Sequence, residues 1–247
     1  MIVKADLHIH TALSPCGSLE MGPTAVVARA RELGLDVIAI TDHNAVANAR
    51  AAMLVGERLG VSVLPGLEAQ TREDIHVVCL FPSWAACAGY YEQIYPLLPA
   101  VPASPDFFGD QVVVDDRDEV VRCEEKLLAN ALDLPLGDLV EGVRRAGGEV
   151  LPAHVEDPGH GLLVTLGWVP QELGAALFEV SRTVAAAPAG NPYLPLLGDR
   201  PWITNSDAHY LCDVGRAFTE FSVDGPGLAP LYRAGLERRF RLRFARG

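Results

Sequence analysis

The sequence has few of the features that would place the protein outside the cell or in a membrane. Its five cysteines are odd in number and irregularly spaced, so no disulfide framework is predicted. No N-terminal stretch combines a basic start with an apolar core, and no apolar run approaches the ~18 residues that a membrane span needs. We therefore expect a cytoplasmic protein with reduced cysteines.

Positive charge is also scarce. The chain has 20 Lys and Arg residues against 32 Asp and Glu residues, a formal net charge of −12. This balance disfavours broad attraction to nucleic acid, because cationic side chains must neutralise phosphates. Seven arginines form two local basic stretches, which are either solvated surfaces or anion-binding patches: Arg144, Arg145, Arg238, Arg239, Arg241, Arg243 and Arg246. The composition favours a small phosphorylated substrate as partner, with nucleic acid as the alternative.

The order of apolar segments predicts the fold class. With 247 residues, 49% of them hydrophobic, the chain can bury a full core. Strands are predicted at 2–10, 37–41, 61–67, 75–81, 149–152, 177–181, 202–205 and 218–223, and helices at 23–33, 45–59, 85–97, 136–146 and 171–176. The alternation predicts an α/β fold with a mostly parallel sheet, either open or closed into a barrel.

No linker or internal repeat divides the chain, so residues 1–247 are predicted to form a single domain. Three prolines followed by acidic residues mark the segment 99–118 as an insertion or a lid. Phe107 and Phe108 lie in this segment. They either form an aromatic cover for a base or sugar, or pack into the core.

Histidine is abundant at the ends of the predicted strands. Six of the seven histidines lie in short ligand-type clusters: His8, His10, His43, His76, His154 and His209. Most of them follow strands, at the face where barrels and parallel sheets build active sites. Imidazole and carboxylate suit zinc, manganese or iron. The two-residue period of a strand should point Asp6 to the side of His8 and His10, where it would accept a hydrogen bond from a ligand histidine.

Five short motifs resemble those of the PHP (polymerase and histidinol phosphatase) superfamily. They are Asp-Leu-His-Ile-His-Thr at 6–11, Thr-Asp-His-Asn at 41–44, Gly-Leu-Glu at 66–68, Pro-Ala-His at 152–154 and Ser-Asp-Ala-His at 206–209. Each motif alone is weak, but the five occur in order and span nearly the whole chain. The resemblance implies a distorted seven-stranded (β/α)7 TIM-like barrel, with two or three divalent zinc, manganese or iron ions at the C-terminal ends of the strands.

The resemblance also implies a ligand set. Three groups of residues would hold the metals: His8, His10, Glu68 and Asp207 for the first; Glu68, His76 and His154 for the second; Cys16, His43 and His209 for the third. Many relatives have histidine at the position of Cys16. This residue either binds the third ion as a thiolate or is a loop thiol that packs beside the site. Asp42 is expected to coordinate a metal or to support the ligands.

Two cations bridged by a carboxylate and ~3.5–4 Å apart can activate a shared hydroxide for in-line attack on a phosphoryl group. The predicted activity is therefore phosphoric ester hydrolysis of a small phosphomonoester, with Glu68, Asp207 and His209 as catalytic residues. Arg182 and Arg216 are predicted to bind the substrate. A nucleotidase or a 5′/3′ exonuclease acting on nucleic-acid ends is the alternative hypothesis.

Two other classes compete with this prediction. An amidohydrolase would need a carboxylated lysine, but the only lysines, Lys4 and Lys126, do not follow strands at the required place. A non-catalytic metal-binding module would be expected to have lost ligands, and nearly all are present. Asp157 and His160, in the loop after His154, either meet the substrate or are ordinary polar loop residues.

Overall fold

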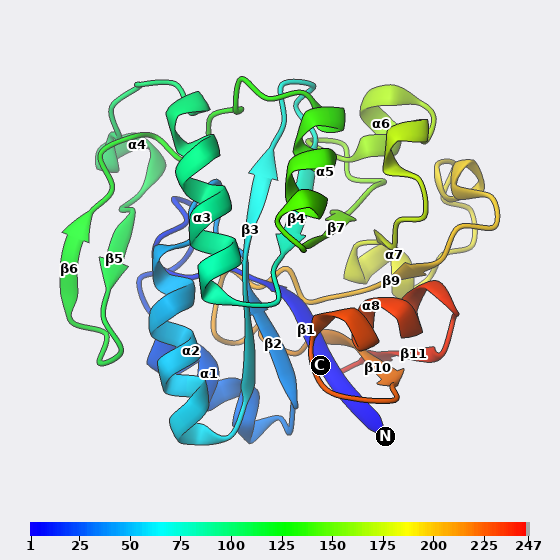
Figure 1. Cartoon of the computed structure of the whole chain (residues 1–247), viewed down its shortest axis with the longest axis horizontal. Coiled ribbons are helices and arrows are strands. Elements are labelled where there is room, and N and C mark those ends of the chain that lie inside the picture. Colours follow the sequence, from blue (N-terminus) through cyan, green and yellow to red (C-terminus); the bar gives the residue numbers. More distant parts are fainter. Residues whose placement is uncertain (246–247) are drawn as a thin grey trace.

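The computed structural model describes residues 1–245, and its main element is a curled sheet of seven strands (Figure 1). The strand order is β11-β10-β1-β2-β3-β4-β7. These strands are β1 Ile2–Ile9, β2 Val37–Ile40, β3 Ser62–Gln70, β4 His76–Leu80, β7 Glu149–Pro152, β10 Ala217–Ser222 and β11 Phe240–Phe244. Two small sheets pair β5 (Val112–Val114) with β6 (Val120–Cys123), and β8 (Phe178–Glu179) with β9 (Trp202–Ile203).

The seven-stranded sheet is mixed, so the prediction of a mostly parallel sheet was wrong. Only the pairs β1–β2 and β2–β3 are parallel, and the other four pairs are antiparallel. Strands β3 and β4 are joined only by residues 71–75, a link too short for the crossover that parallel neighbours require. As a result the first residue of β4, His76, pairs with the last residue of β3, Gln70. Although His76 begins its strand, it therefore lies at the edge of the sheet where β3 ends.

Strands β8 and β9 lie between β7 and β1 but pair only with each other. The N–H of Val155, after β7, donates to the Glu179 carbonyl at 2.9 Å, and the Leu7 N–H donates to Asn205 Oδ1 at 2.9 Å. Within residues 1–245 the main ladder runs from β11 to β7 without closing on itself. The predicted α/β class and a curled seven-stranded sheet are confirmed, whereas a closed TIM-like barrel is not.

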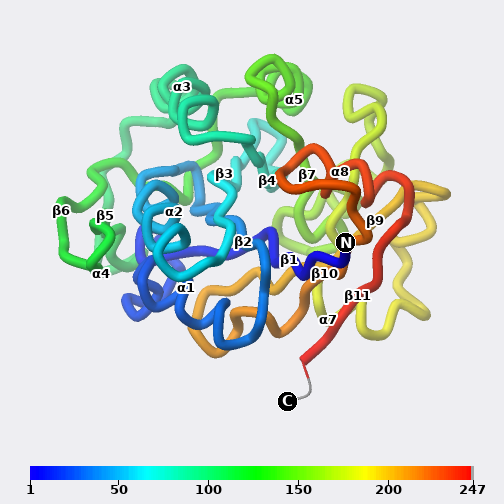
Figure 2. The backbone as a smooth tube through the Cα atoms, turned by 60° about the horizontal axis from the view of Figure 1, so that its bottom comes forward, coloured from blue at the N-terminus to red at the C-terminus, as the bar shows by residue number. Residues whose placement is uncertain are grey.

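Helices surround the sheet, as the tube view in Figure 2 also shows. They are α1 Pro23–Glu32, α2 Ala47–Leu59, α3 Trp84–Ile94, α4 Pro105–Phe108, α5 Leu136–Arg145, α6 Leu162–Leu166, α7 Arg182–Ala186 and α8 Leu228–Leu236, with 3-10 turns at Tyr95–Leu97, Gln171–Leu173 and Leu194–Leu197. The first four helices predicted by periodicity are present. The fifth, at 171–176, is only a 3-10 turn, and α4, α6, α7 and α8 were not predicted. None of these helices combines the length and apolar character that a membrane crossing requires.

The two faces of the sheet pack against different helices. Val3, Ala5 and Leu7 share a buried cluster with Leu231 of α8. In contrast, Ile9 belongs to the cluster under α1 and α2. The side chains of β1 therefore stop alternating strictly between the two faces of the sheet after Leu7. The register of β1 with β2 shifts there, as it does at a β-bulge, which can redirect side chains near an active site.

This change of phase corrects the prediction for Asp6. Asp6 pairs with Ile38, which lies on the face covered by α1 and α2. His8 and His10 flank Ile9 and so point to the opposite face. The expectation that Asp6 shares a side with both histidines was wrong, because a strict two-residue period was assumed through the bulge.

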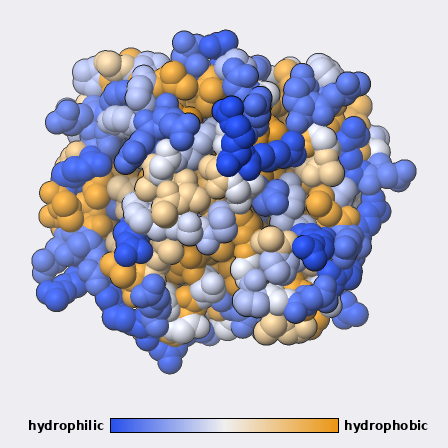
Figure 3. Space-filling view, viewed as in Figure 1, coloured by the Kyte–Doolittle hydropathy of each residue, from blue (hydrophilic) through white to orange (hydrophobic). Residues whose placement is uncertain are grey.

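The segment 99–118 contains α4 and the first strand of the β5–β6 hairpin, which lie side by side in Figures 1 and 2. Figure 3 shows a mostly hydrophilic rim on this face and an apolar patch over the hairpin, where Val120 and Val121 are exposed. The N–H of Val112 donates to the Ala12 carbonyl at 2.8 Å. The segment is thus attached to the loop that follows the histidines of β1.

Candidate metal centre

Eight of the nine predicted metal ligands converge at one edge of the curled sheet. They come from β1 and its end, from the loop after β2, from β3, from the start of β4 and from the loops after β7 and β9: His8, His10, His43, Glu68, His76, His154, Asp207 and His209. Glu68 lies within β3, since that strand extends to Gln70. The remaining predicted ligand, Cys16, lines the cavity at this cluster together with His43 and His76.

The carboxylate of Glu68 occupies the centre of the cluster and is almost fully buried. Its Oε1 lies 3.0 Å from His76 Nδ1 and 3.1 Å from His154 Nε2, and its Oε2 lies 2.9 Å from His43 Nδ1. The two histidines of the β1 motif each place Nε2 3.4 Å from a Glu68 oxygen. One carboxylate therefore faces five imidazoles.

Asp207 adds a second carboxylate. Its Oδ1 lies 3.5 Å from His8 Nε2 and 3.3 Å from His10 Nε2. Asp207 and His154 both have a positive φ, 50° and 27°, a conformation that is costly for residues other than glycine and that clusters at functional sites. The surrounding structure holds both ligand candidates in these positions.

The donor atoms fit divalent metal ions. Three groups each bring their ligand atoms within 4.8 Å of one another: His8, His10 and Asp207; His43, Glu68 and His76; His10, His43 and His209. The Nε2 atoms of His8 and His10 are only 3.1 Å apart, and the buried His154 Nδ1 has no hydrogen-bond partner among the described residues. Imidazole nitrogens and carboxylate oxygens aimed at a shared centre are the donors that suit zinc, manganese or iron.

The charges at the site also favour a cation. Burial alone would lower the pKa of His8, but Glu179, Glu68 and Asp207 raise it well above its usual value. Burial would raise the pKa of Glu68, yet the surrounding histidines lower it. For His10, burial and the neighbouring histidines both lower the pKa. Ionised Glu68 and neutral His10 are thus in the forms that bind metal. The negative charge that favours a proton on His8 would equally attract a metal cation in its place.

Cys16 differs from the other predicted ligands. Its thiol is exposed and is absent from the three groups of close ligand atoms found in residues 1–245. Burial of part of the residue would raise its pKa, but the imidazoles of His209 and His43 lower it to about 6. The thiolate form is therefore accessible near neutral pH.

Two buried aspartates support the cluster from outside. Asp42 accepts a hydrogen bond from Ser14 Oγ at 2.7 Å, and Ser14 Oγ lies 2.9 Å from His10 Nδ1. The two oxygens of Asp6 accept the backbone N–H groups of Ser206 and Gly215, each at 3.0 Å. Asp6 thus anchors the loop that carries Asp207 and His209, and it has no ligand histidine as partner.

The predicted substrate arginines lie together, beside a different cavity. Arg182 Nη1 lies 2.9 Å and Arg216 Nε 3.3 Å from the same oxygen, Asp213 Oδ1. Both line a cavity of 590 Å³ with Arg29.

The cavity at the metal cluster, of 390 Å³, is lined by His43, His76, His160, Cys16, Pro15, Gln70, Ala129, Phe107 and Phe108. His160 stacks on His76 with ring centroids 4.1 Å apart, whereas Asp157 caps its own loop through the Gly159 N–H.

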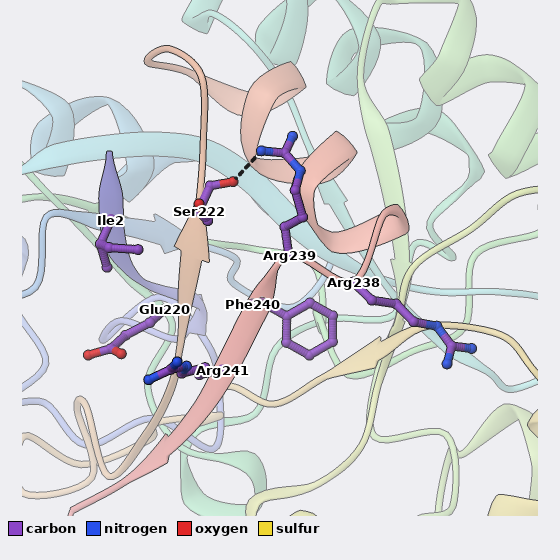
Figure 4. A pocket seen from close by; sticks show the side chains of 7 residues that line it. All are labelled: Ile2, Glu220, Ser222, Arg238, Arg239, Phe240 and Arg241. Carbon is purple, nitrogen blue, oxygen red and sulfur yellow. Dashed lines mark hydrogen bonds between the residues drawn. The ribbon is translucent and has the colours of Figure 1, made fainter.

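The C-terminal arginines lie far from the metal cluster. Arg238, Arg239 and Arg241 line a cavity of 490 Å³ beside Ile2 and Glu220 (Figure 4). Arg239 is held by Ser222 and Asp224, and Arg243 pairs with Glu220. Ile2 begins β1, and at about 3.3 Å per residue it lies roughly 20 Å from His8. Arg246 lies outside the described residues.

Comparison with known proteins identifies the family. Residues 6–138, more than half of the chain, match the family model of the PHP domain. The chain belongs to the PHP domain family. Residues 199–240 match a second family described as PHP-associated, and the sequence resemblance is thereby confirmed.

Relatives of this PHP domain include nucleases. A 5′-3′ exoribonuclease of Haemophilus influenzae is 28% identical over 158 residues, 62% of this chain and 49% of that protein. Among solved structures, the lesion-specific endonuclease EndoQ of Pyrococcus furiosus has a TM-score of 0.69 at 18% identity, covering 98% of this chain and 58% of that one. An amidohydrolase of Chromobacterium violaceum has a TM-score of 0.59 at 22% identity, covering 96% and 97%. The two structures show the shared fold, and the chain spans about half the length of the curated relatives it matches.

Sequence reasoning missed the carboxylate that contacts His8. Glu179 of β8 is almost fully buried, and its Oε1 lies 3.0 Å from His8 Nδ1. The other oxygen accepts Asn205 Nδ2 at 2.7 Å. A lone acidic residue inside the apolar run Leu-Phe-Glu-Val was the available signal, since a buried charge needs a partner. In this PHP domain Glu179 has the position that had been predicted for Asp6.

Glu179→Gln is expected to weaken metal binding about 10- to 100-fold, the usual effect of losing an outer hydrogen-bond partner of a ligand histidine. The amide keeps the size of the side chain but removes the negative charge beside His8 Nδ1. Calorimetric titration of the chelated protein with zinc or manganese measures the change. Glu149→Gln, on neighbouring β7, is the control and should bind metal normally. Equal affinities in both variants would contradict a supporting role for Glu179.

Proposed function

We propose that this PHP domain is a metal-dependent phosphoesterase that hydrolyses a small phosphomonoester. The observation that carries the proposal is the position of Glu68, whose oxygens lie within 3.4 Å of nitrogens from five histidines. A carboxylate so placed suits a bridge between cations. Bridged divalent ions would supply an activated water and would stabilise the charge that develops on a phosphoryl group.

The proximity of the donor atoms supports the ligand assignment. His8, His10, Glu68 and Asp207 would hold one ion, Glu68, His76 and His154 a second, and His43, His209 and Cys16 a third. Glu68 and Asp207 keep the site anionic. The leaving group would be neutralised by the third ion or, in protein whose third site is empty, by a proton from the half-buried His209. Burial would lower the pKa of His209, but Cys16 and Asp207 raise it, which favours the protonated form that a donor needs.

Arg182 and Arg216 remain the proposed substrate-binding cations. Asp213 offsets only one of their two positive charges, so a net positive charge is left for an anion. Their cavity is separate from the one at the metal cluster. They would therefore contact a part of the substrate that extends away from the reacting phosphate.

A nucleotidase or an exonuclease acting on nucleic-acid ends is the second candidate. It is favoured by the similarity to a 5′-3′ exoribonuclease and by the fold shared with EndoQ, whose structure is also known with a 27-mer duplex that has an abasic lesion at the active site. The net charge of −12 opposes it, since binding a long polyanion requires cationic side chains.

The test follows phosphate release from phosphomonoesters and nucleotides, and release of mononucleotides from short oligonucleotides, after chelation and re-addition of manganese, zinc or iron. Turnover that returns only with metal supports the phosphoesterase, and the preferred substrate separates the two candidates. No turnover on any ester by the metal-loaded protein would contradict the proposal and favour a non-catalytic metal-binding module.

Cys16→Ala is expected to remove one bound metal ion per chain while the other ions stay, because the thiolate would be lost from the third ligand group only. Metal analysis of the purified, metal-saturated protein measures this directly. Cys212→Ala is the matched control, since Cys212 is another exposed free cysteine. An unchanged metal content in Cys16→Ala would exclude this residue from the ligands.

A further inference from the structure

The cavity at the metal cluster is lined by both polar and aromatic side chains. His43, His76 and His160 are among the polar ones, and Phe107 and Phe108 of α4 line the same cavity. Phe107 is 85% exposed, the largest fraction among the large apolar side chains of residues 1–245, and Phe108 is 49% exposed. Both rings are therefore available to a molecule that enters the cavity.

The segment around α4 is fixed to the site by hydrogen bonds. Gln111 Oε1 accepts the Leu128 N–H at 2.8 Å, and the Leu128 carbonyl accepts Asn44 Nδ2 at 2.9 Å. Asn44 directly follows His43. On the other side, the helix ends at Gly109 with a φ of 85°, where a β-carbon would collide with the Pro15 carbonyl next to Cys16. The close approach that only glycine permits holds α4 against the loop of the metal cluster.

We propose that Phe107 stacks on the nucleobase of a substrate whose phosphate lies at the metal cluster. The inference rests on the proposed phosphoesterase function and narrows its small phosphomonoester to a nucleotide, the substrate that the first candidate shares with the nucleotidase of the second. A ligand that fits must present an anionic phosphoryl group to the histidines of the cavity and a flat apolar face to its phenylalanines. A nucleotide combines these two groups, and stacking on an aromatic ring accepts any base.

The size and charge of the site define the form of this nucleotide. A cavity of 390 Å³ is in the usual range for a small ligand, about 300–1,000 Å³. The excess of acidic residues, 32 against 20 basic ones, opposes the binding of many successive phosphates. The base therefore belongs to a mononucleotide or to the terminal nucleotide of a short strand.

The experiment compares adenosine 5′-monophosphate with ribose 5-phosphate, which lacks only the base, and with a 5′-phosphorylated dinucleotide. In Phe107→Ala the ratio of kcat/KM for the nucleotide to that for the sugar phosphate is expected to fall about tenfold, through KM, as for loss of an aromatic partner of one base. Phe107→Trp should retain the ratio. Trp168→Ala removes another exposed aromatic ring that does not line the cavity and should behave as wild type. The dinucleotide shows whether a strand end is accepted as well.

A ratio that is unchanged in Phe107→Ala, or a wild-type protein that does not prefer the nucleotide, would overturn the stacking proposal. Calorimetric binding of the same two compounds to the metal-loaded protein gives an independent readout. If no ester is hydrolysed, the phosphoesterase function fails, while the binding ratio still decides whether Phe107 recognises the base. If ribose 5-phosphate is hydrolysed with the same kcat/KM as the nucleotide, only the stacking proposal fails.

Discussion

Glu68→Gln is expected to lower kcat about a thousandfold or more and to reduce the metal content of the protein. The Glu68 oxygens face imidazole nitrogens from five histidines, and a neutral amide would remove the central negative charge of the cluster. Bound metal supplies several kcal/mol of transition-state stabilisation, and about 4 kcal/mol corresponds to a thousandfold in rate. Steady-state kinetics and metal analysis measure the two effects.

The control for this substitution is Glu124→Gln. Glu124 is also a buried glutamate, but it accepts a hydrogen bond from Tyr95 Oη at 2.7 Å and belongs to none of the ligand groups found in the described residues. This variant should keep its turnover and its metal. Full activity with full metal content in Glu68→Gln would show that Glu68 is not the bridging carboxylate.

Metal is expected to raise the thermal stability of the chelated protein by roughly 10 °C. A ligand present at about 1,000 times its Kd stabilises the folded state by about 4 kcal/mol, and about 1 kcal/mol shifts the Tm of a protein of this size by roughly 2–4 °C. The effect is large because the buried histidines and carboxylates are assembled only in the folded chain, so the ions would bind it in preference to the unfolded one. Thermal unfolding followed over a series of zinc or manganese concentrations measures the shift.

Glu68→Gln serves as the comparison in the same measurement. Its Tm should respond much less to metal than that of the wild type, because the central ligand is missing. A wild-type Tm that stays constant from chelated to metal-saturated conditions would argue against a preformed metal site at these residues.

Much of the fold was predictable because periodicity is a local property of the chain. The strand 149–152 was predicted with its observed bounds, and α1 and α2 begin and end within two residues of the predicted limits. The elements that were missed are β5, β6 and β11 and the helices α4, α6, α7 and α8. The direction of β4 and the separate pairing of β8 with β9 depend on which segments meet across the sheet, and periodicity contains no information about that.

The site was predictable to the level of residue types. Eight of the nine predicted metal ligands lie in one cluster, because motifs at the ends of neighbouring strands meet at one edge of a sheet. His76 differed from the other predicted ligands because it begins a strand instead of following one, and the antiparallel direction of β4 brings it to the same edge of the sheet. The partners outside the cluster were not predictable. Glu179 has the role that was expected of Asp6 because of a bulge in β1 and because the strand that carries Glu179 lies about 170 residues away in the chain.

The sequence by itself determined the family, the α/β class and the histidines and carboxylates of the candidate metal site, because these depend on residue identity and on spacing along the chain. Only the tertiary structure decided that Glu68 lies at the centre of five imidazoles, that Glu179 contacts His8, and that Phe107 lines the same cavity as three histidines. These relations depend on strand direction, on the phase change within β1 and on the anchoring of α4. Each results from contacts between residues distant in the chain, which no local pattern specifies.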